Sequence, residues 1–427
     1  MPEKKKKKQK VKPNPFLDVS ILKKFLQTYE RHCDEFQSSV SPTIKKGLWS
    51  CINNEVAITK FVLSSPETIP EDFPPVLFKP LVKTIRDMRY MLGKELCIWG
   101  ILLSNLDTAS LAIMLELNGR TIYPFCKLEM IDCDIDVWSM ERLGKALRFS
   151  NLVSIVLDYN EFGDEGVKGL LHGLEGNKKL LSLSLCYCNL GAESGSALGP
   201  VVAQTAIQEL YLNGNYLQCS GALELITPIS MHTQYLAAER QTVLETSTDF
   251  AHQILEATES AGIHTAVSNL DVLPTTPQSA IPEDTNKDKK KRKGKKKKKR
   301  DAPEAGPWLA KLHLADNGID GRGEEGETGV VEFTQLLSYL IRYSEHLSEV
   351  DLDDNCIGEL SANDILQALE ERKKGKLPNL EVKVTAQISL ETFSSILKKS
   401  KKCKSIKKRK KKKTANSKAL LQEAPGD

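Results

Sequence analysis

The sequence predicts an α/β solenoid, in which a short strand and a helix alternate along the chain. Residues 152–162 carry apolar side chains at their first, fourth, sixth and eleventh places and Asn at the ninth. The same template begins again at Leu180 and at Ile207, after 28 and then 27 residues. A fixed period in this range is typical of units that stack on one another.

The spacing within the template has a physical reason. Side chains alternate between the two faces of a strand, so the fourth and sixth residues point together into a core. The amide of the ninth-position Asn can satisfy backbone groups where the chain leaves the strand. Cys133 and Cys188 occupy this place in two of the copies. No unit buries its apolar face alone, so we expect neighbouring units to stabilise one another.

The residues after the strand indicate which kind of repeat the template belongs to. Gly163-Asp164-Glu165-Gly166-Val167, followed by Leu170, Leu171 and Leu174, resembles the leucine-rich repeat of the ribonuclease-inhibitor-like subtype. The resemblance implies a horseshoe of parallel strands with outer helices, and a role in protein binding. The resemblance also implies that Cys can replace Asn at the ninth place of the template.

Further copies extend the array in both directions. Clear copies begin at Phe125, Leu309 and Leu347, and Leu96 with Ile98 marks a degenerate one. A weak last strand is expected at 377–382 and a closing helix at 390–397. Leu309 begins 102 residues after Ile207, which predicts an insertion between them.

The chain before the repeats is expected to be helical, over 18–32, 44–63 and 77–92. We interpret it as a cap on the first repeat, with an independent docking domain as the alternative. The predicted organisation is a disordered basic tail (1–15), a helical N-terminal cap (16–92), a first block of repeats (93–230), a partly helical and then disordered Lys-rich insertion (231–306), a second block with a C-terminal cap (307–397) and a basic disordered tail (398–427).

Charge is distributed unevenly. Three tracts, 4–12, 287–300 and 398–413, hold 31 of the 60 basic residues and a single acid. The remainder carries 29 basic residues against 55 acidic ones. The sequence therefore predicts an acidic body with three basic appendages. Ten cysteines without a secretory signal favour an intracellular chain with reduced thiols, and no apolar run is long enough for a membrane span.

The motifs favour a chain that is not an enzyme. No CxxC pair, HExxH or GxSxG string occurs, which predicts neither a metal nor a catalytic residue. Residues 321–326 match GxGxxG, but two adjacent glutamates would repel a pyrophosphate. We expect no cofactor.

The candidate site is the concave face that the exposed strand positions would form. Acidic residues outnumber basic ones there, so we expect a negative potential and a basic partner protein. Tyrosines are favoured interface anchors. The predicted residues are Glu129, Asp132, Asp158, Tyr159, Tyr187, Glu209, Tyr211, Asn213, His313, Asp316, Glu349, Asp351 and Asp353.

The lysine tracts allow several interpretations: a nuclear or nucleolar localisation signal, nonspecific binding of RNA or acidic protein tails, and internal masking of the acidic face. The tracts contain no aromatic residue, so base stacking is not expected. The candidate polyanion-binding or localisation residues are Lys289, Lys290, Lys291, Arg292, Lys293, Lys407, Lys408, Arg409 and Lys410.

The sequence favours a protein-binding scaffold in the cytoplasm, in the manner of cytoskeletal or ciliary proteins. The alternative is a nuclear or nucleolar protein that binds RNA through the lysine tracts.

Overall fold

The computed structural model describes residues 19–65, 74–116, 123–260, 306, 308–322 and 326–400, with the backbone alone for 241–260. The chain divides into two units. One comprises Met1–Gln234 with Pro303–Asp427 and contains every described strand, and the other comprises Tyr235–Ala302.

Nine parallel strands form one sheet, and each strand pairs with the next in chain order. The strands are β1 (Lys60–Ser64), β2 (Glu95–Trp99), β3 (Lys127–Ile131), β4 (Ser154–Val156), β5 (Ser182–Ser184), β6 (Glu209–Tyr211), β7 (Lys311–His313), β8 (Glu349–Leu352) and β9 (Glu381–Val384). Strand order that follows chain order, with helices between parallel strands, confirms the predicted α/β solenoid.

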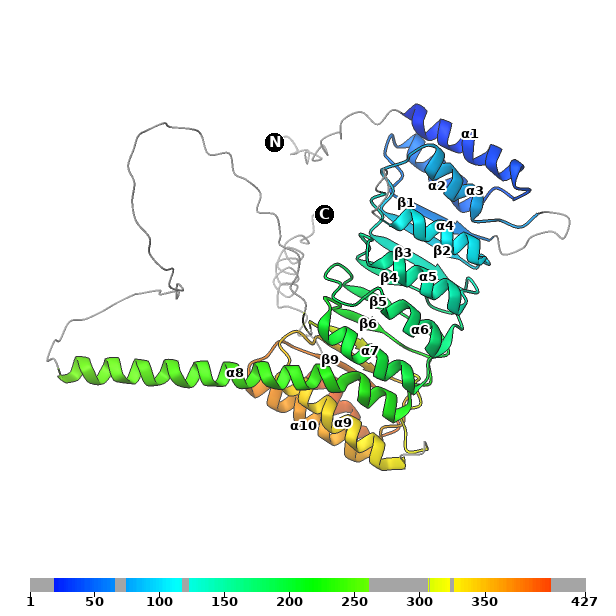
Figure 1. Cartoon of the computed structure of the whole chain (residues 1–427). Coiled ribbons are helices and arrows are strands. Elements are labelled where there is room, and N and C mark those ends of the chain that lie inside the picture. Colours follow the sequence, from blue (N-terminus) through cyan, green and yellow to red (C-terminus); the bar gives the residue numbers. More distant parts are fainter. Residues whose placement is uncertain are drawn as a thin grey trace, which may run out of the picture. The chain divides into compact units, whose positions relative to one another are not determined.

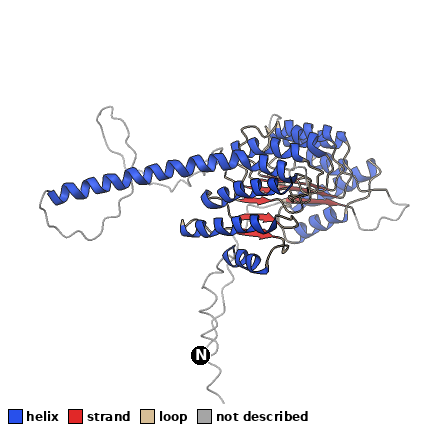
Figure 2. Cartoon of the chain, turned by 90° about the horizontal axis from the view of Figure 1, so that it is seen from below, coloured by secondary structure: helices blue, strands red, loops and turns tan. Residues whose placement is uncertain are grey.

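Helices connect the strands and line the sheet (Figures 1 and 2). They are α1 (Val19–Glu35), α2 (Pro42–Asn53), α3 (Lys79–Asp87), α4 (Asn105–Leu115), α5 (Val137–Leu147), α6 (Gly163–Leu171), α7 (Ala192–Gln204), α8 (Gln218–Ser260), α9 (Gly326–Tyr343), α10 (Gly358–Lys374) and α11 (Leu390–Ser400). The helices over 18–32 and 390–397 and the weak last strand were correctly predicted.

The N-terminal segment differs from its prediction. The expected helix over 44–63 ends at Asn53, and β1 follows it and pairs with β2. Alternation explains the strand, because Phe61 and Leu63 are fully buried whereas Val62 and Ser64 are partly exposed. The segment predicted to be a wholly helical cap therefore contributes the first strand of the sheet.

The insertion begins as the continuation of a repeat helix. Helix α8 starts at Gln218 and runs to Ser260, with no break at the predicted boundary near residue 231. The start of the insertion was predicted to be helical, and the described part is helical as far as Ser260. The predictions of disorder for the Lys-rich part of the insertion and for the two basic tails concern residues outside the described ones, except 398–400, which belong to α11 instead.

A column of buried polar side chains joins successive repeats. The Nδ2 of Asn160 donates to the carbonyl oxygens of Met130, Leu157 and Asp158. Its Oδ1 accepts from the backbone N–H groups of Cys133 and Ile135. One amide thus satisfies five backbone groups in two repeats, as the template predicted.

Other members of the column repeat this geometry. Asn215 and Asn355 donate to the preceding repeat and accept two backbone N–H groups from it. The thiols of Cys133 and Cys188 donate to carbonyls of the preceding repeat, Ile98 and Leu157. Cysteine therefore supplies the donor half of the bridge.

Replacing Asn160 by Ala should lower the free energy of unfolding by about 3 kcal/mol or more, because several buried backbone groups lose their partner. Asn151→Ala removes an amide that contacts only the Lys179 ammonium at the surface, and should change stability by less than about 0.5 kcal/mol. Chemical denaturation followed by circular dichroism measures both. Equal losses in the two variants would contradict the bridging role.

Glycines allow the helices of adjacent repeats to approach closely. A Cβ on Gly195 in α7 would lie 2.0 Å from the carbonyl oxygen of Gly221 in α8, and one on Gly173 would lie 1.7 Å from that of Gly144. A backbone oxygen held in a helix cannot move aside as a flexible side chain can. The absence of a Cβ atom at these glycines therefore allows the close spacing of the repeats on the helical side.

Gly195→Ala should therefore destabilise the solenoid by about 1–3 kcal/mol through overpacking. Gly47→Ala is the matched control, because that helical glycine would place its Cβ in ordinary contact, 3.7 Å from Ile58. Helix propensity favours Ala by about 0.5–1 kcal/mol there. Thermal unfolding should move in opposite directions for the two variants, and a shift of the same sign would contradict the packing argument.

Candidate protein-binding surface

The open face of the sheet is built from strand residues that alternate with the buried ones. Their columns follow the strand register, so Glu209, Lys311 and Glu349 are neighbours, as are Tyr211, His313 and Asp351. Side chains one repeat apart therefore meet even though up to 102 residues separate them in the sequence.

Most acids in the middle of this face are already paired. The Lys127 ammonium lies 2.6 Å from Glu129, and that of Lys311 lies 2.8 Å from Glu209. Lys383 in β9 approaches Asp351 at 2.9 Å and Glu349 at 3.2 Å. Three ammonium groups thus pair with four of the carboxylates expected to attract a partner, so the negative potential in the middle of the sheet is smaller than the sequence indicated.

Glu129 is one of the two buried carboxylates among these four, with Asp351. Burial favours its neutral form, but hydrogen bonds from Lys127, Cys97 and the Trp99 indole outweigh burial and lower the pKa of Glu129. Its charge is therefore held by neighbours within the sheet. We assign it a structural role rather than a contact with a partner.

His313 lies among charged groups of three strands. Its imidazole nitrogens are 3.4 Å from Glu349 and 3.7 Å from Asp351, and its ring meets Tyr211 edge-on at 4.7 Å. Burial lowers the pKa of His313, and Lys383 and Lys311 act in the same direction against the two carboxylates. The imidazole is therefore neutral at neutral pH.

This lowered pKa predicts the sign of a pH effect. Below the ordinary value of 6.5, the unfolded chain binds a proton at His313 that the folded chain does not. The His313 contribution to stability is thus complete above that pH and is lost as the pH falls below it. His313→Gln should reduce the dependence of the unfolding free energy on pH between 7.5 and 5.5. His172→Gln, at an exposed position, should keep the dependence of the parent chain.

The edge where the strands end carries an unusual backbone. The residue at this place has a positive φ in seven repeats: Gly100, Asp132, Tyr159, Tyr187, Gly214, Asp316 and Asp354, between 52° and 69°. In six of them its N–H donates to a carbonyl of the next repeat, as from Tyr159 to Cys186 and from Tyr187 to Asn213, whereas the N–H of Asp354 donates to the Asp353 carboxylate. The left-handed turn therefore continues the ladder between repeats beyond the strands.

Two neighbouring repeats place tyrosine in this turn. The rings of Tyr159 and Tyr187 stack with centroids 4.7 Å apart and planes 7° apart. They remain 54% and 42% exposed. Glycine and Asp suit a left-handed backbone, whereas a bulky side chain there costs about 1–2 kcal/mol. Strained and exposed aromatic rings are a feature of binding sites.

Gly214 completes the arrangement. A Cβ there would lie 2.1 Å from the Tyr187 ring, so the absence of a side chain leaves space for that ring. The stack therefore has fixed neighbours: Tyr159, then Tyr187, then the bare backbone of Gly214.

Acids without a cationic partner lie along the same edge. Asp132, Asp316 and Asp354 are exposed, and none of them forms an ion pair with another described residue. Burial raises the pKa of Tyr187, and the charges of Tyr159, Asp316, Cys186 and Asp354 add to it. The negative potential at this edge therefore extends to the tyrosine stack.

The structure thus separates the predicted residues into three groups. An edge group contains Asp132, Tyr159, Tyr187, Asp316 and Asp353. Paired strand residues are Glu129, Glu209, Tyr211, His313, Glu349 and Asp351. Asp158 and Asn213 instead accept backbone N–H groups of the next repeat, Cys186 and Ala315.

The sequence analysis missed Lys383, Gly214 and the base in β1, Lys60. Alternation along the strand could have predicted Lys383, because it follows the buried Val382 and therefore points to the open face. The candidate polyanion-binding lysines and arginines lie outside the described residues.

Comparison with known proteins supports the repeat. A family described as "Leucine Rich repeat" matches residues 150–171, which contain β4 and α6. No curated relative matches this chain. The match and the nine parallel strands together show a leucine-rich-repeat solenoid, an architecture that usually binds other proteins without catalysis.

The described residues contain neither a membrane-spanning helix nor a metal-binding cluster. No helix there has the length and apolar character needed to cross a bilayer. No group of His, Cys, Asp and Glu in that part of the chain is arranged to hold a metal ion.

Proposed function

We propose that this protein is a non-enzymatic scaffold that binds a basic segment of a partner protein along the edge formed by Tyr159, Tyr187 and the neighbouring aspartates. The observation that carries the proposal is the exposed tyrosine stack in a strained backbone turn. Exposed rings and a strained turn both cost free energy, and contact of the rings with a partner would offset that cost.

The chemistry of the edge favours Arg and Lys on the partner. A cation placed over a tyrosine face gains about 0.5–1 kcal/mol at an exposed site. Asp316 and Asp354 lie on the Gly214 side of the stack and Asp132 lies on the Tyr159 side. An extended basic segment crossing the repeats would meet an acid, two aromatic faces and two further acids.

This proposal is narrower than the one drawn from the sequence. The paired carboxylates of the inner strands contribute complementarity, while the unpaired ones at the edge supply steering and specificity. Interface energy is concentrated in a few aromatic anchors, which matches two stacked tyrosines better than a long acidic face.

The finer assignments rest on the sequence. We place the protein with cytoskeletal or ciliary scaffolds of the ribonuclease-inhibitor-like subtype, because of the 27–28-residue period and the basic insertion. The competing function, RNA binding in the nucleus, rests on the three lysine tracts.

Proximity labelling in cells tests the proposal with two substitution variants of the full chain and one deletion variant. Tyr159→Asn/Tyr187→Asn removes the rings while keeping a residue that tolerates positive φ. Tyr339→Gln/Tyr343→Gln is the matched control, because those tyrosines form an exposed pair on α9 with centroids 5.6 Å apart. The third variant lacks residues 287–300.

We expect the edge variant to lose its main protein partners by about tenfold or more in recovery, a change equivalent to about 1.4 kcal/mol. The α9 variant and the deletion variant should keep them. Partners that survive the edge substitutions refute this site. Partners that vanish with the deletion, or after ribonuclease treatment, would establish the lysine tracts as the functional element.

A further inference from the structure

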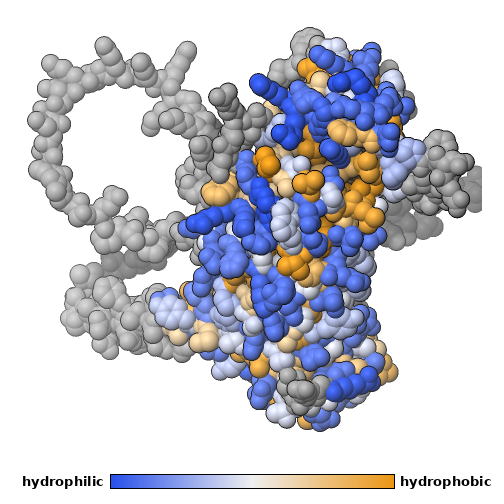
Figure 3. Space-filling view, turned by 45° about the vertical axis from the view of Figure 1, so that its right-hand side comes forward, coloured by the Kyte–Doolittle hydropathy of each residue, from blue (hydrophilic) through white to orange (hydrophobic). Residues whose placement is uncertain are grey.

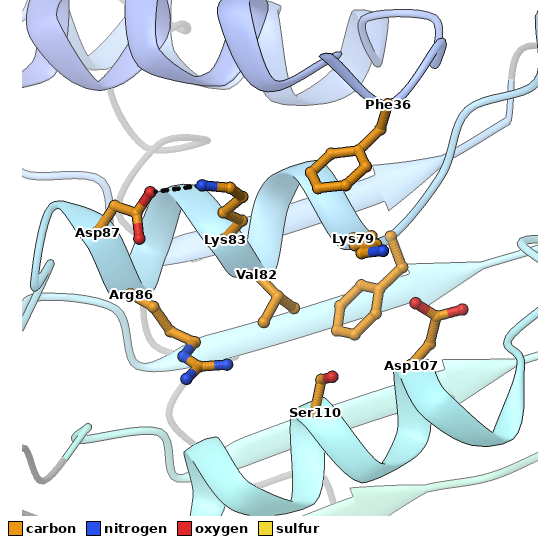
Figure 4. A pocket seen from close by; sticks show the side chains of 9 residues that line it. Phe36, Lys79, Val82, Lys83, Arg86, Asp87, Asp107 and Ser110 are labelled. Carbon is orange, nitrogen blue, oxygen red and sulfur yellow. Dashed lines mark hydrogen bonds and ion pairs between the residues drawn. The ribbon is translucent and has the colours of Figure 1, made fainter.

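A second recessed surface lies on the helical side, between α3 and α4. The cavity has a volume of about 370 Å³ and opens to solvent between the two helices (Figure 4). Pockets of about 300–1,000 Å³ accommodate a ligand or a protein side chain. The proposed scaffold function does not use this side of the molecule.

The cavity has an apolar floor. Phe36 from the segment after α1, Phe78 before α3 and Val82 within α3 line it. The Lys79 ammonium lies over the Phe36 ring, 4.5 Å from its centroid. A side chain of the size of Leu would contact aromatic and aliphatic groups here.

One wall of the cavity carries a free cation. Lys83 pairs with Asp87 at 3.1 Å on the side of α3 that faces α1. Arg86 instead points from α3 toward α4 and Ser110 (Figure 4), and among the described residues no carboxylate pairs with it. Its exposed guanidinium can therefore donate two parallel hydrogen bonds to a carboxylate, in the bidentate geometry that Arg favours.

The carboxylate on the opposite wall is already engaged. Asp107 accepts from the backbone N–H and the hydroxyl of Ser104, and its own N–H donates to that hydroxyl. This capping box fixes the first turn of α4 and keeps the carboxylate on the helix terminus. In Figure 4 it lies near Lys79, away from Arg86.

The outer face of α4 exposes apolar side chains beside this cavity. Leu106 is 78% exposed and Ile113 is 55% exposed, and their spacing places them on one stripe with Ser110. Trp138 holds the place in α5 that Leu106 holds in α4, and it is also exposed. Figure 3 shows apolar side chains gathered between hydrophilic ones on the upper half of the visible face.

We propose that the groove between α3 and α4 binds an acidic amphipathic helix of a partner protein. Its apolar stripe would cover Leu106 and Ile113 and insert one side chain over Phe78 and Val82. A glutamate or aspartate beside that stripe would pair with Arg86, and Lys79 would hold a second acid. Helix-in-groove recognition joins an apolar stripe to flanking charges in this way.

The charge of the groove distinguishes this partner from the one proposed for the sheet edge. Lys79 and Arg86 would repel a basic segment, whereas the edge with Asp316 and Asp354 would repel an acidic one. The solenoid therefore presents two surfaces of opposite preference, and the groove proposal stands without the function proposed for the edge.

Fluorescence anisotropy with the full chain tests the groove. The probe is a fluorescein-labelled helical peptide of Ala, Leu and Glu, with Leu at i, i+3 and i+7 and Glu flanking that stripe. A second peptide carries Gln in place of each Glu. We expect the Glu peptide to bind about tenfold more tightly than the Gln peptide, with a difference that shrinks as salt is added.

Arg86→Glu should weaken binding of the Glu peptide by about tenfold or more, and Arg86→Lys by less, because Lys cannot pair bidentately. Arg148→Glu, at the C-cap residue directly after α5, is the matched control. It reverses an exposed arginine outside the cavity and should leave affinity within about twofold.

Leu106→Gln/Ile113→Gln tests the apolar stripe independently, and the exposure of both residues makes misfolding no concern. It should weaken binding of both peptides. The proposal is overturned if the two peptides bind alike, if Arg86→Glu binds as the parent chain does, or if the Glu peptide shows no binding at about 1 mM.

Discussion

The structure depends on one interaction, repeated from β3 to β8, in which a buried Asn or Cys side chain joins a repeat to the one before it. Asn160 ties its own turn to two N–H groups and a carbonyl of the preceding repeat. Without it these groups would be buried and unpaired, at a cost of about 1–3 kcal/mol each. The apolar column of Leu128, Ile155 and Leu183 is fully buried, and a one-residue slip of register would turn these side chains outward, so the column and the amides specify the same register.

The amide column joins the turns of successive repeats, and with the apolar column it fixes where the chain turns away from the sheet. Seven repeats enter a left-handed conformation at the same place, and six of them donate an N–H to a carbonyl of the next repeat there. Side chains at that place project in a line, which is why Tyr159 and Tyr187 stack although 28 residues separate them. The binding surface is thus a consequence of how the repeats join, and Gly214 leaves room for it.

Much of the fold could be predicted, because the strand template depends on local alternation and a column residue. The template fails at β1, where neither Asn nor Cys follows Phe61 and Leu63 at the required place. The charge pattern was harder to predict for another reason. Lys383 pairs with Asp351 across a strand boundary, 32 residues apart, so its effect appears only once the register is known. Counting acids on each strand separately overstated the potential of the inner sheet.

The two proposed surfaces belong to different repeats and to different sides of the solenoid. The tyrosine stack belongs to the turns after β4 and β5, whereas the groove lies between α3 and α4. In a solenoid each repeat is stabilised mainly by its nearest neighbours, so a substitution in one surface has little effect on a distant repeat. Opposite charge then gives the two surfaces different partners. A chain of this design can hold a basic and an acidic partner together, and neither has to compete for the site of the other.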